Sequence, residues 1–239
     1  MTREPGASAP TQGSGLAPPG STARTRVRRL PEKAVTDRDV AYEILDSGLV
    51  AHVAVTVEGQ PFAVPVGYAR RGDEVVFHGS TGSRLFRALA DGYPTCLTVT
   101  LLDGIVLARS LFESSMNYRG VMALGTCRRL TGDDELDALL RISDHLLPGR
   151  VAEARHPSRK ERSATMTLAL ALDEISVKVG EGGPTDDPED LEDPVYSRIW
   201  AGHVPLEESF AAPVADDLAQ GIPVPDYVRT WPAPGQRRP

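Results

Sequence analysis

The stretch 75–89 combines an apolar strand, a turn of small residues and the start of a helix. The turn has hydroxyl groups at Ser80, Thr81 and Ser83, and Arg84 follows directly. Backbone N–H groups at the start of a helix have no partner within the helix, so they favour an anion. Hydroxyl donors and a forked guanidinium also suit phosphate oxygens. The stretch therefore indicates a phosphate-binding turn, and the structural alternative is that Ser83 simply caps an ordinary helix.

The composition excludes several classes of protein. The chain has 239 residues, of which 41% are hydrophobic, so it is long enough to bury a substantial core. Its net charge of -7 argues against a general nucleic-acid-binding protein, which carries a basic face. No apolar run approaches the ~20 residues that span a bilayer, and the N-terminus lacks the apolar core of a signal peptide. We therefore expect a soluble, cytoplasmic protein that binds neither nucleic acid nor membranes.

The chain has no conventional metal or hydrolytic motif. Cys96 and Cys127 are far apart and lack the CxxC or Cys/His spacing of a zinc site. They leave open one long-range disulfide, but free thiols in a reducing compartment are the simpler interpretation. A GxSxG elbow, an HExxH pair and a P-loop are also missing from the sequence. We therefore predict no metal site and assign no catalytic residue.

Both ends of the chain differ from the middle. Residues 1–25 are rich in Pro, Gly, Ser, Ala and Thr, a composition typical of a disordered leader. The acidic stretch 181–193 predicts a mobile loop, and 207–239 predicts an extended, Pro-rich tail. The remaining residues, 26–206, form the expected domain. It begins beside a basic cluster that we interpret as solvated, with contact to an acidic partner or to a ligand phosphate as the alternatives. The cluster consists of Arg24, Arg26, Arg28 and Arg29.

Short strands dominate the predicted domain. Capping residues and helical spacing of apolar residues predict a helix over 36–47. A further helix is expected over 133–147, besides the one that starts near Arg84. Asp103-Gly104 is a hairpin signal between two of the strands. Successive short strands with few helices favour a small, mainly β barrel with two or three peripheral helices. The predicted strands are 49–57, 62–69, 74–78, 95–102, 105–112, 118–130, 164–172 and 175–179.

Five motifs occur in an order that resembles a known family. VRRLPE, HGSTGSR, LLDGIVLARS, NYRG and DEISVKV are similar to the flavin-nucleotide-binding branch of the pyridoxamine 5'-phosphate oxidase-like proteins, which is related to the nitroimidazole-resistance proteins. The resemblance covers about 26–206. It implies a split β-barrel that forms a homodimer and holds FMN at the subunit interface. Because flavin itself carries hydride or electrons, it further implies an FMN-dependent oxidoreductase acting on a small organic molecule.

The resemblance also implies which residues bind the cofactor. Ser80, Ser83 and Arg84 correspond to phosphate ligands, and the strand around Pro65 corresponds to the one beside the isoalloxazine ring. Proline cannot donate to a sheet ladder, so neighbouring main-chain groups are left for a ligand. Arg119 is expected to pair with the phosphate or with the ring. The full set is Pro65, Val66, Tyr68, His78, Ser80, Thr81, Ser83, Arg84, Asn117, Tyr118, Arg119 and Trp200.

Each of these assignments has a structural alternative. Pro65 is also explained as an edge-strand proline, and Trp200 as a side chain that closes the barrel end. Gly120 stands where the family resemblance leads us to expect serine, Glu113-Ser114 replaces a His-rich pair, and His203 replaces an aliphatic residue. The first two differences concern the substrate side of the site more than the flavin side, and His203 is either a specificity change or a harmless exposed ring.

Three other functions stay open at this point. Related split-barrel proteins bind haem, which needs an exposed imidazole as axial ligand, and His52 and His78 are the candidates. A deazaflavin-dependent reductase needs the same phosphate end and room for a longer tail. A non-catalytic flavin-binding protein needs the cofactor site alone. The sequence does not identify the substrate.

Overall fold

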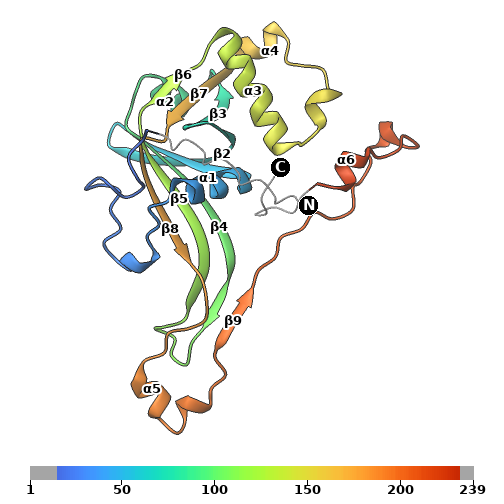
Figure 1. Ribbon diagram of the computed structural model, residues 1–239. Coiled ribbons are helices and arrows are strands. Elements are labelled where there is room, and N and C mark those ends of the chain that lie inside the picture. The colour runs from blue at the N-terminus through green and yellow to red at the C-terminus, as the bar shows by residue number, and fades with distance from the viewer. Residues whose placement is uncertain (1–14, 232–239) are drawn as a thin grey trace, which may run out of the picture.

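The computed structural model describes residues 15–231, and one curled antiparallel sheet runs through them (Figure 1). Along the sheet the strands follow the order β6-β7-β3-β2-β1-β4-β5-β8, and β9 pairs with the far end of β4. Their bounds are β1 Val50–Val57, β2 Gln60–Arg71, β3 Glu74–Ser80, β4 Thr95–Leu107, β5 Ser115–Gly125, β6 Cys127–Arg129, β7 Thr165–Ala171, β8 Glu174–Gly180 and β9 Gly202–Pro205. The prediction of a mainly β split barrel is confirmed.

Three helices of seven residues or more accompany the sheet in the described part of the chain. They are α1 (Arg38–Ser47), α2 (Arg84–Ala90) and α3 (Gly132–Leu146). The shorter α4 (Arg159–Ala164), α5 (Pro188–Glu192) and α6 (Asp226–Arg229) lie in the connections. None of the helices within these residues is both long and apolar enough to cross a membrane.

The two faces of the sheet are covered differently. The inner face encloses the main core, which α1 and α2 close with buried residues such as Ile44, Leu45 and Leu89. The outer face of β3 and β7 packs against α3, where Val76 and Ala169 meet side chains of that helix. The burial of apolar side chains on both faces supplies the main driving force for this arrangement.

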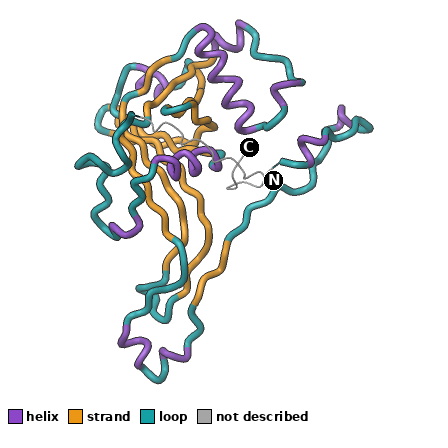
Figure 2. Tube along the Cα trace, in the orientation of Figure 1, coloured by secondary structure: helices purple, strands orange, loops and turns teal. Residues whose placement is uncertain are grey.

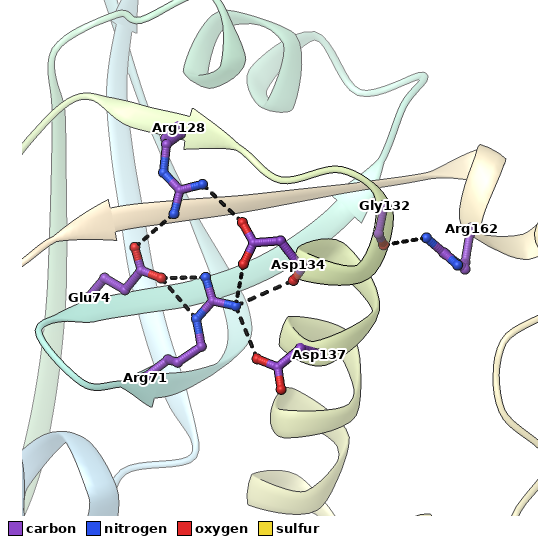
Figure 3. Close-up of polar contacts among 7 residues, drawn as sticks. All are labelled: Arg71, Glu74, Arg128, Gly132, Asp134, Asp137 and Arg162. Atoms are coloured by element: carbon purple, nitrogen blue, oxygen red, sulfur yellow. Dashed lines mark hydrogen bonds and ion pairs between the residues drawn. The ribbon is translucent and has the colours of Figure 1, made fainter.

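Ion pairs attach α3 to the sheet (Figure 3). Arg71 at the end of β2 pairs with Glu74 at the start of β3 and with Asp134 and Asp137 on α3. Arg128 on β6 pairs with Glu74 and Asp134, at 3.2 and 3.0 Å. The cluster therefore connects the β2–β3 turn, the edge strand β6 and the first turns of α3.

The structure corrects the predicted hairpin at Asp103-Gly104. β4 continues through this dipeptide with a bulge between Leu102 and Gly104, and the chain reverses only between β4 and β5. The reason is a long-range contact, because β9 pairs with β4 from Gly104 to Leu107 and extends it. The ends of β4, β5 and β8, together with β9, form an arm that projects from the barrel (Figure 2).

Other boundaries also differ from the prediction. The predicted strand 118–130 is divided into β5 and β6, and the acidic stretch 181–193 contains the short helix α5. Of the predicted leader, residues 1–14 lie outside the described residues. The Gly20 N–H donates to the Ile175 carbonyl on β8 at 2.8 Å, and Arg38 donates to the Ala17 carbonyl. Part of the tail, 232–239, also lies outside the description. Both cysteines are free thiols.

Candidate functional site

The sheet opens between β2 and β3. The two strands pair from Tyr68↔Phe77 to Arg71↔Glu74 only. Toward Gln60, β2 pairs with β1 alone, and toward Ser80, β3 pairs with β7 alone. Within the described residues, the facing edges of these strand segments therefore have no sheet partner, and their main-chain groups are available to a ligand.

The turn at residues 80–83 uses some of its polar groups internally. The Ser80 hydroxyl oxygen accepts from the Gly82 N–H at 3.1 Å, and the Ser83 hydroxyl oxygen caps α2 by accepting from the Phe86 N–H at 3.4 Å. The N–H and hydroxyl of Thr81 both donate to the Ala164 carbonyl, at 3.1 and 3.2 Å. The helix cap that the sequence left as an alternative is thus present, and the Ser80 hydroxyl proton remains available to donate.

Arg84 supplies the positive charge of the turn. Its side chain is exposed and lies over the ring of Phe62 on β2, 4.8 Å from the ring centroid. No acidic side chain in residues 15–231 pairs with it, and the amides of Arg84 and Leu85 have no acceptor there. An unpaired guanidinium beside free amides and a hydroxyl fits a phosphate group.

The predicted residues on β2 and β3 divide between core and surface. Val66 and Tyr68 are buried, and the Tyr68 hydroxyl donates to the Leu45 carbonyl at 2.7 Å. Their side chains therefore serve the core, which leaves only their main-chain groups for a ligand. Pro65 and His78 are exposed. Desolvation by neighbouring protein lowers the pKa of His78, which favours the neutral imidazole.

A second group of predicted residues lies on the arm. The Asn117 side-chain amide donates to the Gly182 carbonyl at 2.9 Å, and Arg119 donates to both carboxylate oxygens of Asp103, at 2.9 and 2.7 Å. The hydrogen bond to Asp103 raises the pKa of Arg119 above its ordinary value. Tyr118 is half-buried, and Trp200 is 66% exposed just before β9.

One copy of the chain does not bring the two groups together. Figure 1 shows α2 at the end of the molecule near β6 and β3, whereas β9 and α5 lie along the opposite, projecting arm. Asn117, Tyr118 and Arg119 lie near the start of β5 in that arm, and Trp200 lies two residues before β9. The group around Arg84 and the group around Arg119 are therefore separate within a single chain.

Sequence reasoning missed an exposed apolar face on the arm. Ile105 is the cross-strand partner of Met116 on β5 and of Val204 on β9, so the three side chains share one face. Their exposed fractions are 46%, 47% and 53%. The alternation of inward- and outward-facing residues along β4 was the available signal for this face. The bulge at Asp103 reverses that alternation, and the dipeptide Asp103-Gly104 resembled a turn.

Comparisons with known proteins agree with this architecture. Residues 37–179 match the family described as pyridoxamine 5'-phosphate oxidase. The FAD and heme binding protein from Mycobacterium smegmatis is 43% identical, with a TM-score of 0.80, and the match covers 85% of this chain and 99% of that one. A flavocytochrome from Azotobacter vinelandii is 36% identical, with a TM-score of 0.82 and coverage of 89% and 98%.

A third structure is similar in fold alone. It is a putative 5-nitroimidazole antibiotic resistance protein from Bacteroides thetaiotaomicron, 20% identical with a TM-score of 0.52. The match covers 61% of this chain and 86% of that one. A search of curated proteins found no match.

Proposed function

The chain belongs to the pyridoxamine 5'-phosphate oxidase family, and on that basis we propose that it is a flavin-dependent oxidoreductase acting on a small organic molecule. The observation that carries the proposal is the unpaired Arg84 beside the free Arg84 and Leu85 amides, at the opening between β2 and β3. This turn fits the phosphate of the FMN unit, which FAD also contains. A bound flavin supplies hydride or electron transfer, and the protein orients it.

The proposal includes a homodimer. The two groups of predicted cofactor residues lie in different parts of one subunit, and a second copy is needed to place the arm of one subunit against the turn of the other. The apolar face of Ile105, Met116 and Val204 supports this arrangement, because contiguous exposed apolar side chains mark interaction surfaces. Closure of this face by the partner subunit also excludes water from the flavin ring.

Charge on the apolar face is expected to break the dimer. Ile105→Lys places an ammonium group where the partner subunit packs, and burying an unpaired charge is costly. We expect a monomer with at least a tenfold loss of flavin affinity, measured by light scattering after chromatography and by flavin titration. Leu147→Lys is the control, because Leu147 is similarly exposed (43%) but follows α3 away from the arm. A dimeric I105K variant with normal flavin affinity contradicts the arrangement.

The first experiment on function is the visible spectrum of the purified protein, with released cofactor identified by mass. We expect a two-band flavin spectrum that bleaches with a nicotinamide or another reductant and returns on reoxidation. A deazaflavin in the extract supports the related reductase instead, and a bound flavin that no reductant bleaches supports a non-catalytic flavin-binding protein. A protein that takes up no flavin contradicts the proposal.

Haem is a second candidate ligand, either with flavin or in its place. Its support is the 43% identical protein described as binding FAD and heme, together with the position of His52. His52 is exposed on the outer face of β1, between Pro65 on β2 and Thr98 on β4. An imidazole at the middle of a sheet face that a second copy covers suits an axial haem ligand. His78 lies two residues before Ser80 and is better placed beside the flavin.

We expect His52→Ala to remove the haem-iron ligand. The readout is the Soret band during haem titration, where the variant should lose its ligand-dependent shift and bind haem at least tenfold more weakly. His156→Ala is the control, because His156 is exposed in a loop before α4. A Soret shift that is lost in His78→Ala and retained in His52→Ala assigns the ligand to His78 instead.

A further inference from the structure

A pocket lies between the sheet and the C-terminal segment 207–231, which we call the strap. Its volume is about 530 Å³, within the range of small-molecule sites. The end of α1, the start of β1 and the middle of β4 form one wall, and residues 208–210 of the strap form the other. The pocket therefore combines segments that are more than a hundred residues apart in the sequence.

The strap is fixed at both ends. At its start it continues from β9, which pairs with β4. At its end the Trp231 indole N–H donates to the Pro148 carbonyl at 3.0 Å. The Trp231 ring packs edge-to-face against the ring of Phe210, with 5.7 Å between the centroids. Figure 1 shows the strap returning from the arm toward α3. These contacts hold Phe210 in place as one wall of the pocket.

The lining of the pocket is largely apolar and has a single charge. Val50 and Phe210, two large apolar residues of the lining, are both exposed. Glu208 is the one charged residue of the lining, and no basic side chain in residues 15–231 pairs with it. The hydroxyls of Thr100 and Ser209 add uncharged polar groups. Such a lining favours an apolar ligand, and the unpaired carboxylate favours a positive charge and disfavours a negative one.

The pocket adjoins the opening between β2 and β3. Val50 on β1 is the cross-strand partner of Gly67 on β2. Gly67 is the last residue of β2 before this strand joins β3 at Tyr68. Adjacent strands lie about 4.8 Å apart. Val50 is therefore about one strand spacing from the closed end of the opening.

We propose that this pocket holds the substrate of the flavin site and that the substrate is an apolar organic cation. The inference rests on the proposed flavin-dependent function and deepens it by naming the substrate class. Val50 and Phe210 contact the apolar part of the substrate, and Glu208 pairs with its positive group. An anion of the same shape meets the unpaired carboxylate and is rejected.

Three probes of similar size and different charge test the proposal: benzylamine, benzyl alcohol and benzoate. Calorimetric titrations are made with flavin-loaded wild-type protein, with Glu208→Gln and with the control Glu207→Gln. Glu207 is the neighbouring exposed acid and lies outside the lining. Because an exposed ion pair is weak, we expect benzylamine to bind about three- to fivefold more tightly than benzyl alcohol, and benzoate to bind most weakly. Glu208→Gln should remove the preference for benzylamine, and Glu207→Gln should keep it.

A filled pocket provides a second test. Val50→Phe places a larger side chain in the pocket and should weaken the binding of all three probes by at least about fivefold, because it occupies their space. Val195→Phe is the control, since Val195 is another exposed valine and lies outside the lining. Circular dichroism checks the fold of both variants. Benzylamine should also shift the flavin absorbance of the wild type, because the pocket adjoins the opening.

The outcomes separate this inference from the proposed function. Three results overturn the substrate assignment and leave flavin binding intact: no binding of benzylamine to the flavin-loaded wild type, an unchanged charge preference in Glu208→Gln, or a flavin spectrum that benzylamine leaves unchanged. A wild-type protein that takes up no flavin overturns both proposals.

Discussion

Arg84→Ala is expected to lower flavin affinity by about 10- to 100-fold, because a hydrogen bond to a charged group contributes about 1.5–3 kcal/mol. The guanidinium has no acidic partner in the described chain, so its removal costs the fold only the contact with the Phe62 ring. Flavin titration and the flavin content of the protein as purified measure the effect. The thermal unfolding of the apoprotein should change little.

Two further substitutions make the Arg84 result specific. Arg87→Ala removes another exposed arginine of α2 that has no ion pair within residues 15–231, and it should leave flavin affinity within about twofold of wild type if only Arg84 holds the phosphate. Arg84→Lys keeps the charge but loses the forked geometry, so we expect an intermediate affinity. Equal flavin binding by wild type and Arg84→Ala would show that the phosphate lies elsewhere.

Gly79→Ala is expected to destabilise both the barrel and the flavin site. A Cβ atom at Gly79 would lie 2.3 Å from a ring carbon of Phe86, which is 6% exposed and packs edge-to-face against Phe77. Overpacking of this kind costs about 1–3 kcal/mol, so we expect the melting temperature to fall by roughly 2–12 °C. Because Phe86 lies two residues after Arg84 on α2, flavin affinity should fall as well.

The clash itself is tested by a second substitution. In Gly79→Ala/Phe86→Leu the smaller side chain makes room for the new methyl group. The melting temperature of this double variant should therefore exceed the value expected from adding the effects of the two single substitutions. Gly183→Ala is the control, because no atom lies within 4 Å of its added Cβ and its backbone is not left-handed. A melting temperature of the double variant equal to the sum of the two single effects contradicts the packing explanation.

The two groups of predicted cofactor residues lie apart within one subunit. The predictions for Arg84→Ala and Ile105→Lys therefore depend on dimer formation in different ways. Arg84 belongs to one subunit's turn, whereas Arg119 and Trp200 belong to the arm. If the arm of the partner completes the site, a monomeric variant loses flavin even though its own turn is unchanged. Arg84→Ala and Ile105→Lys should therefore both lose flavin, but only Ile105→Lys should change the molecular mass in solution.

The sequence by itself determined the local elements around the site. The apolar run in β3, the small residues 80–83 and the Ser83 cap are local patterns, and the structure contains the strand, turn and helix in that order. The same holds for α1 and α3, which lie within two residues of their predicted positions. The cofactor assignment came from a family resemblance that the match over 37–179 confirms at the level of family.

Only the tertiary structure decided how these elements combine. β4 passes straight through Asp103-Gly104 because β9, about a hundred residues later, pairs with it. The unpaired charge of Arg84 in the described chain is likewise visible only once every nearby acid has been placed. Helix caps and turns depend on neighbours in sequence, whereas strand extension and charge pairing depend on segments far apart along the chain. Local sequence patterns carry little information about those distant partners.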